Sequence, residues 1–193
     1  MNETIDLLNS LDHEAIEEMA SVLAGVRHRG GRLFILGVGG SAGHASHAVN
    51  DFRKICGFEA YAPTDNVSEL TARTNDEGWE TTFEQWLLGS RITGKDSLLI
   101  FSVGGGDKAA NVSMNIVRAI DLAHRVGAAV TGVVGRSGGY TKQMATASVV
   151  IPPIFSERVT PHTEGLAAVI WHLLVTHPKL KQAQTKWEDL TRV

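Results

Sequence analysis

The sequence contains a single cysteine, Cys56, among its 193 residues. An internal disulfide and a zinc site built from several cysteines are therefore both excluded. No apolar run reaches the roughly 18–20 residues that a membrane-spanning helix needs, so we expect no membrane partner. The N-terminus is acidic and amphipathic, unlike a signal peptide, and we expect a cytoplasmic protein. The net charge of −3 gives no reason to expect a nucleic-acid partner.

The composition, with 43% apolar and 20% charged residues, is typical of a globular protein, and the length suits one domain, residues 1–193. Residues 1–29 carry apolar side chains at helical spacing, with a break expected near residues 10–12. Such a helical segment needs a partner surface on its own domain or on another subunit. We predict that residues 1–29 serve oligomerisation and that residues 30–193 form the core.

Short apolar runs, three of them followed by glycine clusters, alternate with helical stretches along the rest of the chain. The expected strands are residues 32–37, 59–62, 97–102, 128–134 and 148–151, and the expected helices are residues 42–55, 66–73, 78–88, 111–126, 140–145 and 160–175. This alternation predicts an α/β three-layer sandwich, a mostly parallel sheet flanked by helices, with the N-terminal helical segment as an extension. Ligands of such folds bind beyond the carboxyl ends of the strands.

Three glycine-rich loops, residues 37–43, 102–107 and 135–139, each follow an expected strand. None has the lysine of a phosphate-binding P-loop or a well-placed dinucleotide pattern. Backbone amides at a helix N-terminus attract anions, so we predict that these loops bind a ligand together. Plain strand-to-helix turns are the alternative interpretation.

His47 and Asp51 lie four residues apart on one helix face, where they could bind a divalent metal, act as an acid/base pair or form a surface ion pair. His172 lies in an apolar helix, which predicts a buried imidazole with a partner. Thr160 and Pro161 read as the N-cap and first residue of that helix, placing Glu164 in its first turn. Glu164 and His172 would then be about 12 Å apart along the axis, so they meet one ligand only if the helix start is irregular or subunits share the site.

Three motifs together resemble a known family. The first is Gly-x-Gly-Gly-Ser at residues 37–41, with His47 six and Asp51 ten residues after the serine. The others are Asn-Asp-x-Gly at residues 75–78 and the pair of Glu164 and His172. On these motifs the chain resembles sugar isomerase (SIS) domain proteins, whose fold is flavodoxin-like, and within them the phosphoheptose isomerases, over nearly its whole length.

The resemblance implies an aldose–ketose isomerase, an intramolecular oxidoreductase of carbohydrate metabolism. Its phosphorylated sugar would be sedoheptulose 7-phosphate, converted through an enediol to D-glycero-D-manno-heptose 7-phosphate. It also implies a homotetramer with active sites between subunits and one zinc ion per subunit. The implied zinc ligands are His47, Asp51, Glu164 and His172, of which Asp51 and Glu164 are candidate bases and His172 is the candidate acid. The implied substrate contacts are Gly39, Gly40, Ser41, Asn75, Asp76, Ser102, Gly104 and Asp107.

The chain departs from the family pattern at several of these positions. Val38 stands where the family has asparagine, Asp51 where it has glutamate, and Glu164 where it has glutamine. Residues 102–107 replace the family's S-T-S-G-N-S, so hydroxyls are lost, and Asp107 is expected to repel a phosphate. A second hypothesis therefore remains: a non-catalytic SIS module that binds a phosphosugar or serves as an assembly adaptor.

Overall fold

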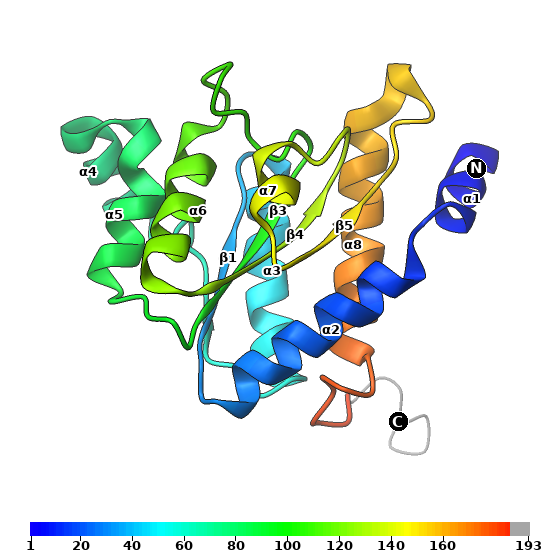
Figure 1. Cartoon of the computed structure of the whole chain (residues 1–193), viewed down its shortest axis with the longest axis horizontal. Helices are drawn as coiled ribbons and strands as arrows, with labels where there is room; N and C mark the ends of the chain where they lie inside the picture. The colour runs from blue at the N-terminus through cyan, green and yellow to red at the C-terminus, as the bar shows by residue number, and fades with distance from the viewer. Residues whose placement is uncertain (186–193) are drawn as a thin grey trace.

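Five parallel strands form the centre of the computed structural model, which describes residues 1–185 (Figure 1). The strands lie in the order β2-β1-β3-β4-β5, and all neighbouring pairs are parallel, where the sequence predicted a mostly parallel sheet. Their bounds are Leu33–Leu36 for β1, Ala60–Tyr61 for β2, Ser97–Ser102 for β3, Ala129–Val134 for β4 and Ala147–Val150 for β5. The predicted α/β sandwich is confirmed.

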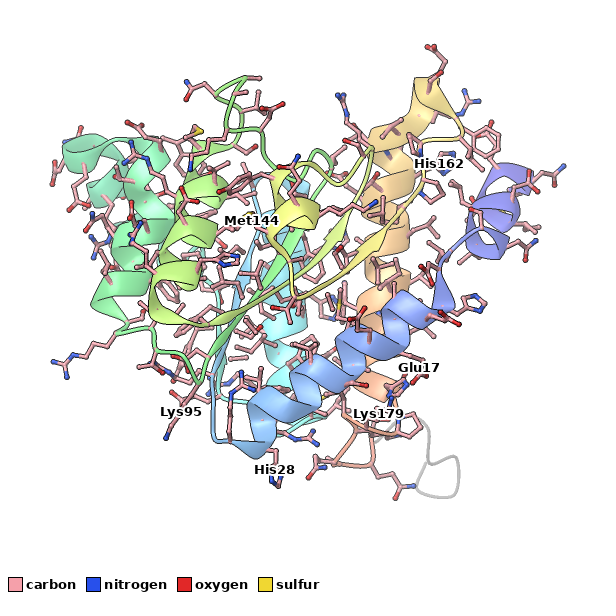
Figure 2. All side chains as sticks on the ribbon, in the orientation of Figure 1. Glu17, His28, Lys95, Met144, His162 and Lys179 are labelled. Atoms are coloured by element: carbon pink, nitrogen blue, oxygen red, sulfur yellow. The ribbon has the colours of Figure 1, made fainter. Side chains whose placement is uncertain are left out.

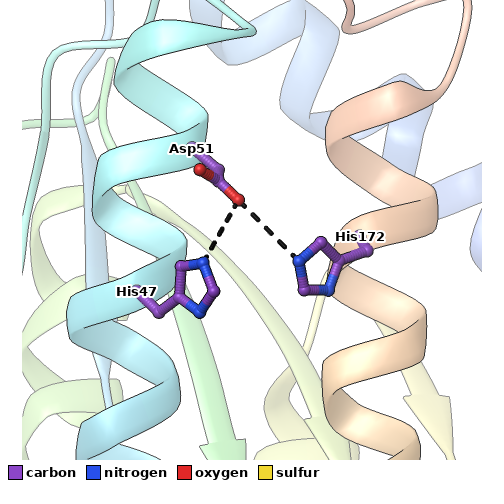
Figure 3. Close-up of side chains that lie close together, drawn as sticks. All are labelled: His47, Asp51 and His172. Atoms are coloured by element: carbon purple, nitrogen blue, oxygen red, sulfur yellow. Dashed lines mark ion pairs between the residues drawn. The ribbon is translucent and has the colours of Figure 1, made fainter. Parts of the chain in front are cut away.

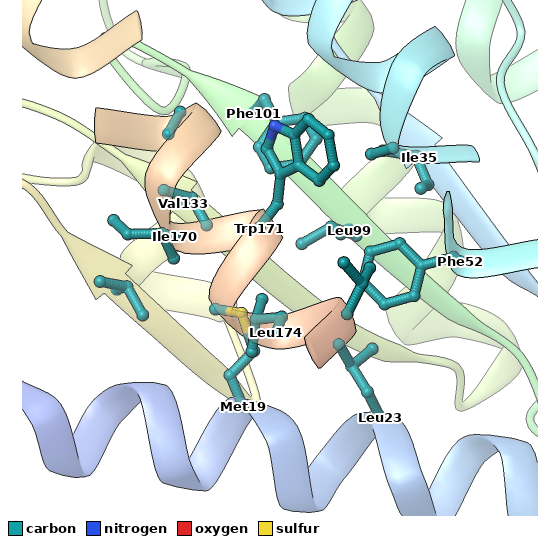
Figure 4. Packing of buried hydrophobic residues seen from close by; sticks show 14 of the residues in the cluster. Met19, Leu23, Ile35, Phe52, Leu99, Phe101, Val133, Ile170, Trp171 and Leu174 are labelled. Carbon is teal, nitrogen blue, oxygen red and sulfur yellow. The ribbon is translucent and has the colours of Figure 1, made fainter. Parts of the chain in front are cut away.

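Helices cover both faces of the sheet because side chains of the central strands alternate between two apolar cores. Leu99 and Phe101 of β3 face the core with α2, α3 and α8 (Figure 4), whereas Leu98 and Ile100 face the core with α5 and α6. The helices are α1 (Asn2–Asn9), α2 (His13–His28), α3 (Gly40–Lys54), α4 (Val67–Glu77), α5 (Thr82–Gly89), α6 (Met114–Val126), α7 (Gly139–Met144) and α8 (Val159–Thr176). Within residues 1–185, no helix combines the length and hydrophobicity that crossing a bilayer requires.

The N-terminal segment forms two helices, and the break expected near residues 10–12 is confirmed, because the Asp12 carboxylate caps α2 by accepting from the Ala15 amide at 3.1 Å. The apolar stripe of α2, including Met19 and Leu23, is fully buried against the chain's own core (Figure 4). This stripe therefore needs no second subunit to cover it. Oligomerisation through residues 1–29 stays a prediction.

Two ionic contacts attach the N-terminal helices to the two ends of α8 (Figure 2). The Glu3 carboxylate accepts from Arg158 and from His162 Nε2 at 2.7 Å. The Glu17 carboxylate accepts from Lys179 Nζ and from the His177 imidazole, both at 2.8 Å. Hydrogen bonds from these basic partners lower the pKa of Glu3 and that of Glu17 to about 2.

Helix α8 begins one residue earlier than the sequence predicted, so the predicted Thr160 cap is wrong. Its N-cap is Arg158, which ends a 3₁₀ turn, and it carries no side-chain cap. Pro161 fits in the first turn because amides there have no intrahelical partner to lose. Glu164 consequently lies in the second turn of a continuous helix, about 12 Å along the axis from His172.

Candidate functional site

The first glycine loop brings the N-terminus of α3 to the carboxyl end of β1. Gly39 has φ 62° and ψ −127°, a conformation that side chains disfavour. Gly37 packs so closely that a Cβ there would lie 2.2 Å from the Ser41 carbonyl oxygen. This turn buries Ser41 and leaves the first amides of α3, which have no intrahelical partner, at the edge of the sheet.

A cavity of about 200 Å³ opens at this edge between β1 and β3. The strand order reverses there, and the crevice at such a switch point is the usual ligand site of open α/β sheets. The lining residues come from the loops after β1 and β3, the start of α6, and α8; they include Val38, Ser41, Ser102, Val103, Gly104, Ser113 and Glu164. The cavity wall thus brings together four residues of the predicted site: Ser41, Ser102, Gly104 and Glu164.

Glu164 lies against the N-terminus of α3. A Cβ atom built on Gly40 would be 2.5 Å from Glu164 Oε1 and 3.1 Å from its Oε2. Within residues 1–185, no ion pair or hydrogen bond engages this carboxylate. The cavity wall therefore holds an unpaired carboxylate available to a ligand.

The second glycine loop differs from the prediction at Asp107. Its backbone pairs with Val112 through two 2.9 Å hydrogen bonds, and its carboxylate accepts from the Ala110 amide at 2.9 Å. Residues 107–112 therefore close on themselves, and Asp107 does not line the cavity. The hydroxyl of Ser113 lines it instead, a residue that the sequence reasoning missed. Aspartate at residue 107 was the available signal, because its side chain often accepts from backbone amides a few residues ahead and so favours turns.

The third glycine loop and the residues after it hold the second loop in place. The structure does not support the prediction that the third loop binds the ligand together with the other two. The amides of Tyr140 and Thr141 donate to the carbonyls of Gly106 and Gly105 at 2.8 and 2.9 Å. The Thr141 hydroxyl also donates to the Gly105 carbonyl at 2.7 Å. These amides at the start of α7 are therefore occupied by the protein itself.

A histidine–carboxylate cluster lies further along α3 and α8 (Figure 3). Asp51 Oδ2 lies 3.6 Å from His47 Nε2 and 3.9 Å from His172 Nε2. Among the residues that the structure describes, this is the one group of three side chains whose ligand atoms all lie within 4.8 Å of one another. Ligands bound tetrahedrally at about 2.0–2.1 Å are roughly 3.3–3.4 Å apart, so small shifts would let these atoms hold zinc.

Neighbouring groups orient the three ligand atoms. His172 Nδ1 donates to the Ala168 carbonyl at 2.7 Å, so the neutral ring presents the Nε2 lone pair to the cluster. The Asn50 amide donates to Asp51 Oδ1 at 2.7 Å and leaves Oδ2 facing the imidazoles. Trp171 packs against both imidazole rings. Such supporting hydrogen bonds are typical of metal-ligating histidines and carboxylates.

Three predicted features of this site do not hold within one chain. His172 is half exposed, with 50% of its side chain accessible, because it lies on the face of α8 opposite the core, so the predicted burial is wrong. Glu164 lies outside the cluster, since the continuous helix separates the two. Asn75 and Asp76 are exposed on α4, where the Asn75 amide donates to Asp76 Oδ1 at 2.7 Å, and they do not line the cavity.

Comparisons with known proteins identify relatives of this chain. The sequence pattern of the SIS domain matches residues 1–135. The lincomycin biosynthesis protein LmbN of Streptomyces lincolnensis is 33% identical over 178 residues, which cover 87% of this chain and 63% of that protein. The phosphoheptose isomerase of Chlorobium phaeobacteroides is 33% identical over 159 residues, which cover 79% of this chain and 66% of that protein. The chain thus spans less than two thirds of the length of these two relatives.

Solved structures share the architecture. A phosphoheptose isomerase from Francisella tularensis superposes with a TM-score of 0.74 at 25% identity, over 89% of this chain and 87% of that chain. The phosphoheptose isomerase GmhA from Neisseria gonorrhoeae gives a TM-score of 0.75 at 23% identity, over 90% and 92% of the two chains. Because the Neisseria protein is 23% identical, its similarity supports the fold alone.

Proposed function

Since the chain belongs to the phosphoheptose isomerase family of SIS-domain proteins, we propose that it is a metal-assisted aldose–ketose isomerase of a phosphorylated sugar. The observation that carries this proposal is the convergence of His47, Asp51 and His172 between α3 and α8, about 12 Å along α8 from the unpaired Glu164 carboxylate at the cavity wall. The named relatives support sedoheptulose 7-phosphate as the first substrate to test. We propose the cytoplasm as its location and the homotetramer as its assembly.

The reaction moves a proton between C1 and C2 through an enediol, so it needs a base at carbon and a stabiliser of charge at oxygen. Glu164 is the proposed base. Its carboxylate lines the cavity, and within the described part of the chain no cation or donor holds it. A carboxylate already engaged by a partner would be a weaker proton acceptor.

His47, Asp51 and His172 are the proposed zinc ligands. A bound zinc ion supplies a Lewis acid that stabilises charge developing on the substrate oxygens. Because His172 Nδ1 donates to the Ala168 carbonyl, Nε2 is the ring atom that can bind a metal, which suits His172 to be a ligand rather than the proton donor that the sequence suggested. The resemblance implied that Asp51 and Glu164 could each be both a zinc ligand and a base. With Glu164 as the base and the other three residues as ligands, no residue has both roles.

Small residues leave room between Glu164 and the cluster. Helical spacing places Gly43 on the face of α3 that carries His47, and Gly165 on the face of α8 that carries His172. A Cβ atom at Gly43 or Gly165 would have no neighbour within 4 Å. A sugar in the cavity therefore meets no side chain at these positions on its way toward the cluster.

The test is turnover of sedoheptulose 7-phosphate and of a shorter ketose phosphate by the full chain, before and after chelation and with zinc restored. We expect zinc-dependent turnover, and a loss of at least about 10–100-fold in His172→Gln, with zinc content reduced. The matched control is His177→Gln at the C-cap of the same helix, whose imidazole contacts Glu17 instead. Equal turnover and equal zinc content in the two variants would overturn the proposal.

A phosphosugar-binding module without turnover is the second candidate. The observation that favours it is the loss of side-chain hydroxyls at Val103 and Gly104 in the cavity wall. Binding of a phosphosugar measured by calorimetry, without turnover of any phosphosugar in the presence of zinc, would establish this candidate.

A further inference from the structure

Two successive residues of α8 carry aromatic rings that stack on each other. The Trp171 indole and the His172 imidazole have ring centroids 3.5 Å apart and planes inclined by 28°. Successive side chains of a helix diverge by about 100° and do not normally face each other. The hydrogen bond from His172 Nδ1 to the Ala168 carbonyl, at 2.7 Å, draws the imidazole back along the helix. This bond and the face of the indole together fix the orientation of the His172 ring.

The same indole contacts the other histidine of the cluster, which comes from a different helix. The His47 ring lies edge-on against Trp171, with centroids 4.7 Å apart and planes inclined by 68°. The two imidazoles are 5.5 Å apart and inclined by 84° to each other. Trp171 thus supports one candidate ligand from α3 and one from α8, and Asp51 Oδ2 faces both of them (Figure 3).

Trp171 is anchored in the core, whereas the two histidines that it contacts are not. Only 1% of Trp171 is exposed, and the residue belongs to the apolar core between the sheet and α2, α3 and α8 (Figure 4). The side chains of His47 and His172 are 58% and 50% exposed. An exposed side chain samples several rotamers unless a neighbour restricts it. The buried indole is a rigid surface that restricts both imidazoles.

The indole N–H of Trp171 carries a cost in stability. Its Nε1 atom is buried, and within residues 1–185 it has no hydrogen-bond partner. A buried donor without a partner is destabilising, and tryptophan N–H groups usually find a partner when they are buried. Phenylalanine would fill much of the same space without this donor. Tryptophan at this position therefore has a reason other than packing.

The face of the indole supplies such a reason. The face of an aromatic ring carries partial negative charge, and among aromatic side chains tryptophan attracts cations most strongly. An imidazole that binds a divalent cation through Nε2 becomes poorer in electrons over its whole ring. The stacked indole therefore interacts more favourably with a metal-bound His172 ring than with a neutral one. A contact that is stronger in the bound state raises the affinity for the ion.

We propose that Trp171 is the positioning residue of the cluster formed by His47, Asp51 and His172. It holds the two imidazoles at the spacing that zinc requires, and it stabilises the charge that the ion places on the His172 ring. This inference rests on the proposed zinc ligands and deepens that proposal, because it adds a residue that acts on the ion through its ligands. Trp171 does not line the substrate cavity, which is the cavity between β1 and β3.

The test is the zinc affinity of the full chain, measured by competition with a chromophoric chelator. We expect Trp171→Leu to weaken zinc binding by about 10–100-fold, the usual effect of losing a group that supports metal ligands. Trp171→Phe keeps an aromatic face and should bind zinc within about fivefold of the parent chain. The matched control is Phe34→Leu, which also removes a fully buried aromatic ring, from the core on the other face of the sheet. It should lose stability and keep the zinc affinity of the parent chain.

Fluorescence gives a second readout that a purely structural role would not move. Zinc should change the tryptophan emission of the parent chain, because the ion binds to the ring that stacks on the indole. This change should vanish in Trp171→Phe although zinc still binds. Equal zinc affinity in Trp171→Leu and Phe34→Leu would overturn the inference. If Trp171→Leu does not fold, emission decides, and zinc binding by the parent chain without a change in emission would overturn the inference.

Turnover separates this inference from the proposed function. Zinc affinity that depends on Trp171, without isomerisation of any sugar phosphate, leaves the inference standing and refutes the isomerase. Isomerisation by a chain whose zinc affinity does not depend on Trp171 refutes the inference and leaves the isomerase standing. A parent chain that binds no zinc also refutes the inference.

Discussion

The carboxylate of Glu164 lies against the backbone of Gly40, so closely that a Cβ atom at Gly40 would fall 2.5 Å from Glu164 Oε1. The two residues are 124 positions apart in the sequence and meet because α3 and α8 pack side by side. The Glu164 carboxylate can therefore occupy this position only because residue 40 has no side chain. Glycine at this position serves the proposed base as well as the turn before α3.

Gly40→Ala should displace the Glu164 carboxylate and lower kcat by roughly 10²-fold if this carboxylate is the base. The fold should persist, because residue 40 is helical and the atom it meets ends a flexible side chain. The matched control is Gly25→Ala in helix α2, away from the cavity, where a Cβ would meet only Arg29 Nη1 at 3.8 Å. Steady-state kinetics beside circular dichroism checks this, and equal kcat in both variants would contradict it.

Two adjacent glycines of the second loop should respond differently to alanine. Gly105 has φ 72°, and its Cβ would lie 1.9 Å from the Gly138 carbonyl oxygen, so Gly105→Ala should lower the free energy of unfolding by about 2–3 kcal/mol. Gly104 has open space and lines the cavity, so Gly104→Ala should keep stability within about 0.5 kcal/mol and raise KM. Urea unfolding and kinetics of both variants test this contrast.

Asp107→Ser should leave KM for a sugar phosphate unchanged, because the carboxylate faces the Ala110 amide and not the substrate cavity. The sequence alone suggested instead that removing this charge would tighten binding. Asp107→Ala should lower the free energy of unfolding by about 1 kcal/mol through loss of that hydrogen bond, and Asp107→Asn, which keeps an acceptor, by less. A clear fall in KM for Asp107→Ser would show that the carboxylate faces the ligand.

Asp96 should make stability depend on pH in the acid range. Burial raises the pKa of this carboxyl, but hydrogen bonds from Arg32 and Thr93 outweigh burial and hold the pKa below its usual value of 3.8. Because the folded pKa is the lower one, the stabilisation is present above about pH 3.8 and is lost as pH falls below it.

Asp96→Asn should therefore cost about 3 kcal/mol near neutral pH and flatten the loss of stability in acid. Asp76→Asn is the control, since that carboxylate is exposed on α4. Urea unfolding between pH 3 and pH 7 measures both effects. An unchanged acid limb in Asp96→Asn would assign the pH dependence to other groups.

The elements of the fold were predictable because their signals are local. Short apolar runs marked all five strands, three of them followed by a glycine cluster, and the break expected near residues 10–12 marked the start of α2. His47 and Asp51 could also be paired in advance, because one helix turn brings them together wherever that helix lies. The predicted cap at Thr160 was wrong because the 3₁₀ turn before α8 continues directly into the helix.

The sequence by itself determined the alternation of strands and helices, the glycine turn before α3 and the pairing of His47 with Asp51, because each depends on neighbours within a few residues. Only the tertiary structure decided that His172 joins this pair from an exposed face and that Glu164 stays apart beside Gly40. It also placed Ser113, and not Asp107, in the substrate cavity. These relationships depend on how α3, α6 and α8 pack on one sheet, and helix periodicity says which residues share a face but not which face meets which neighbour.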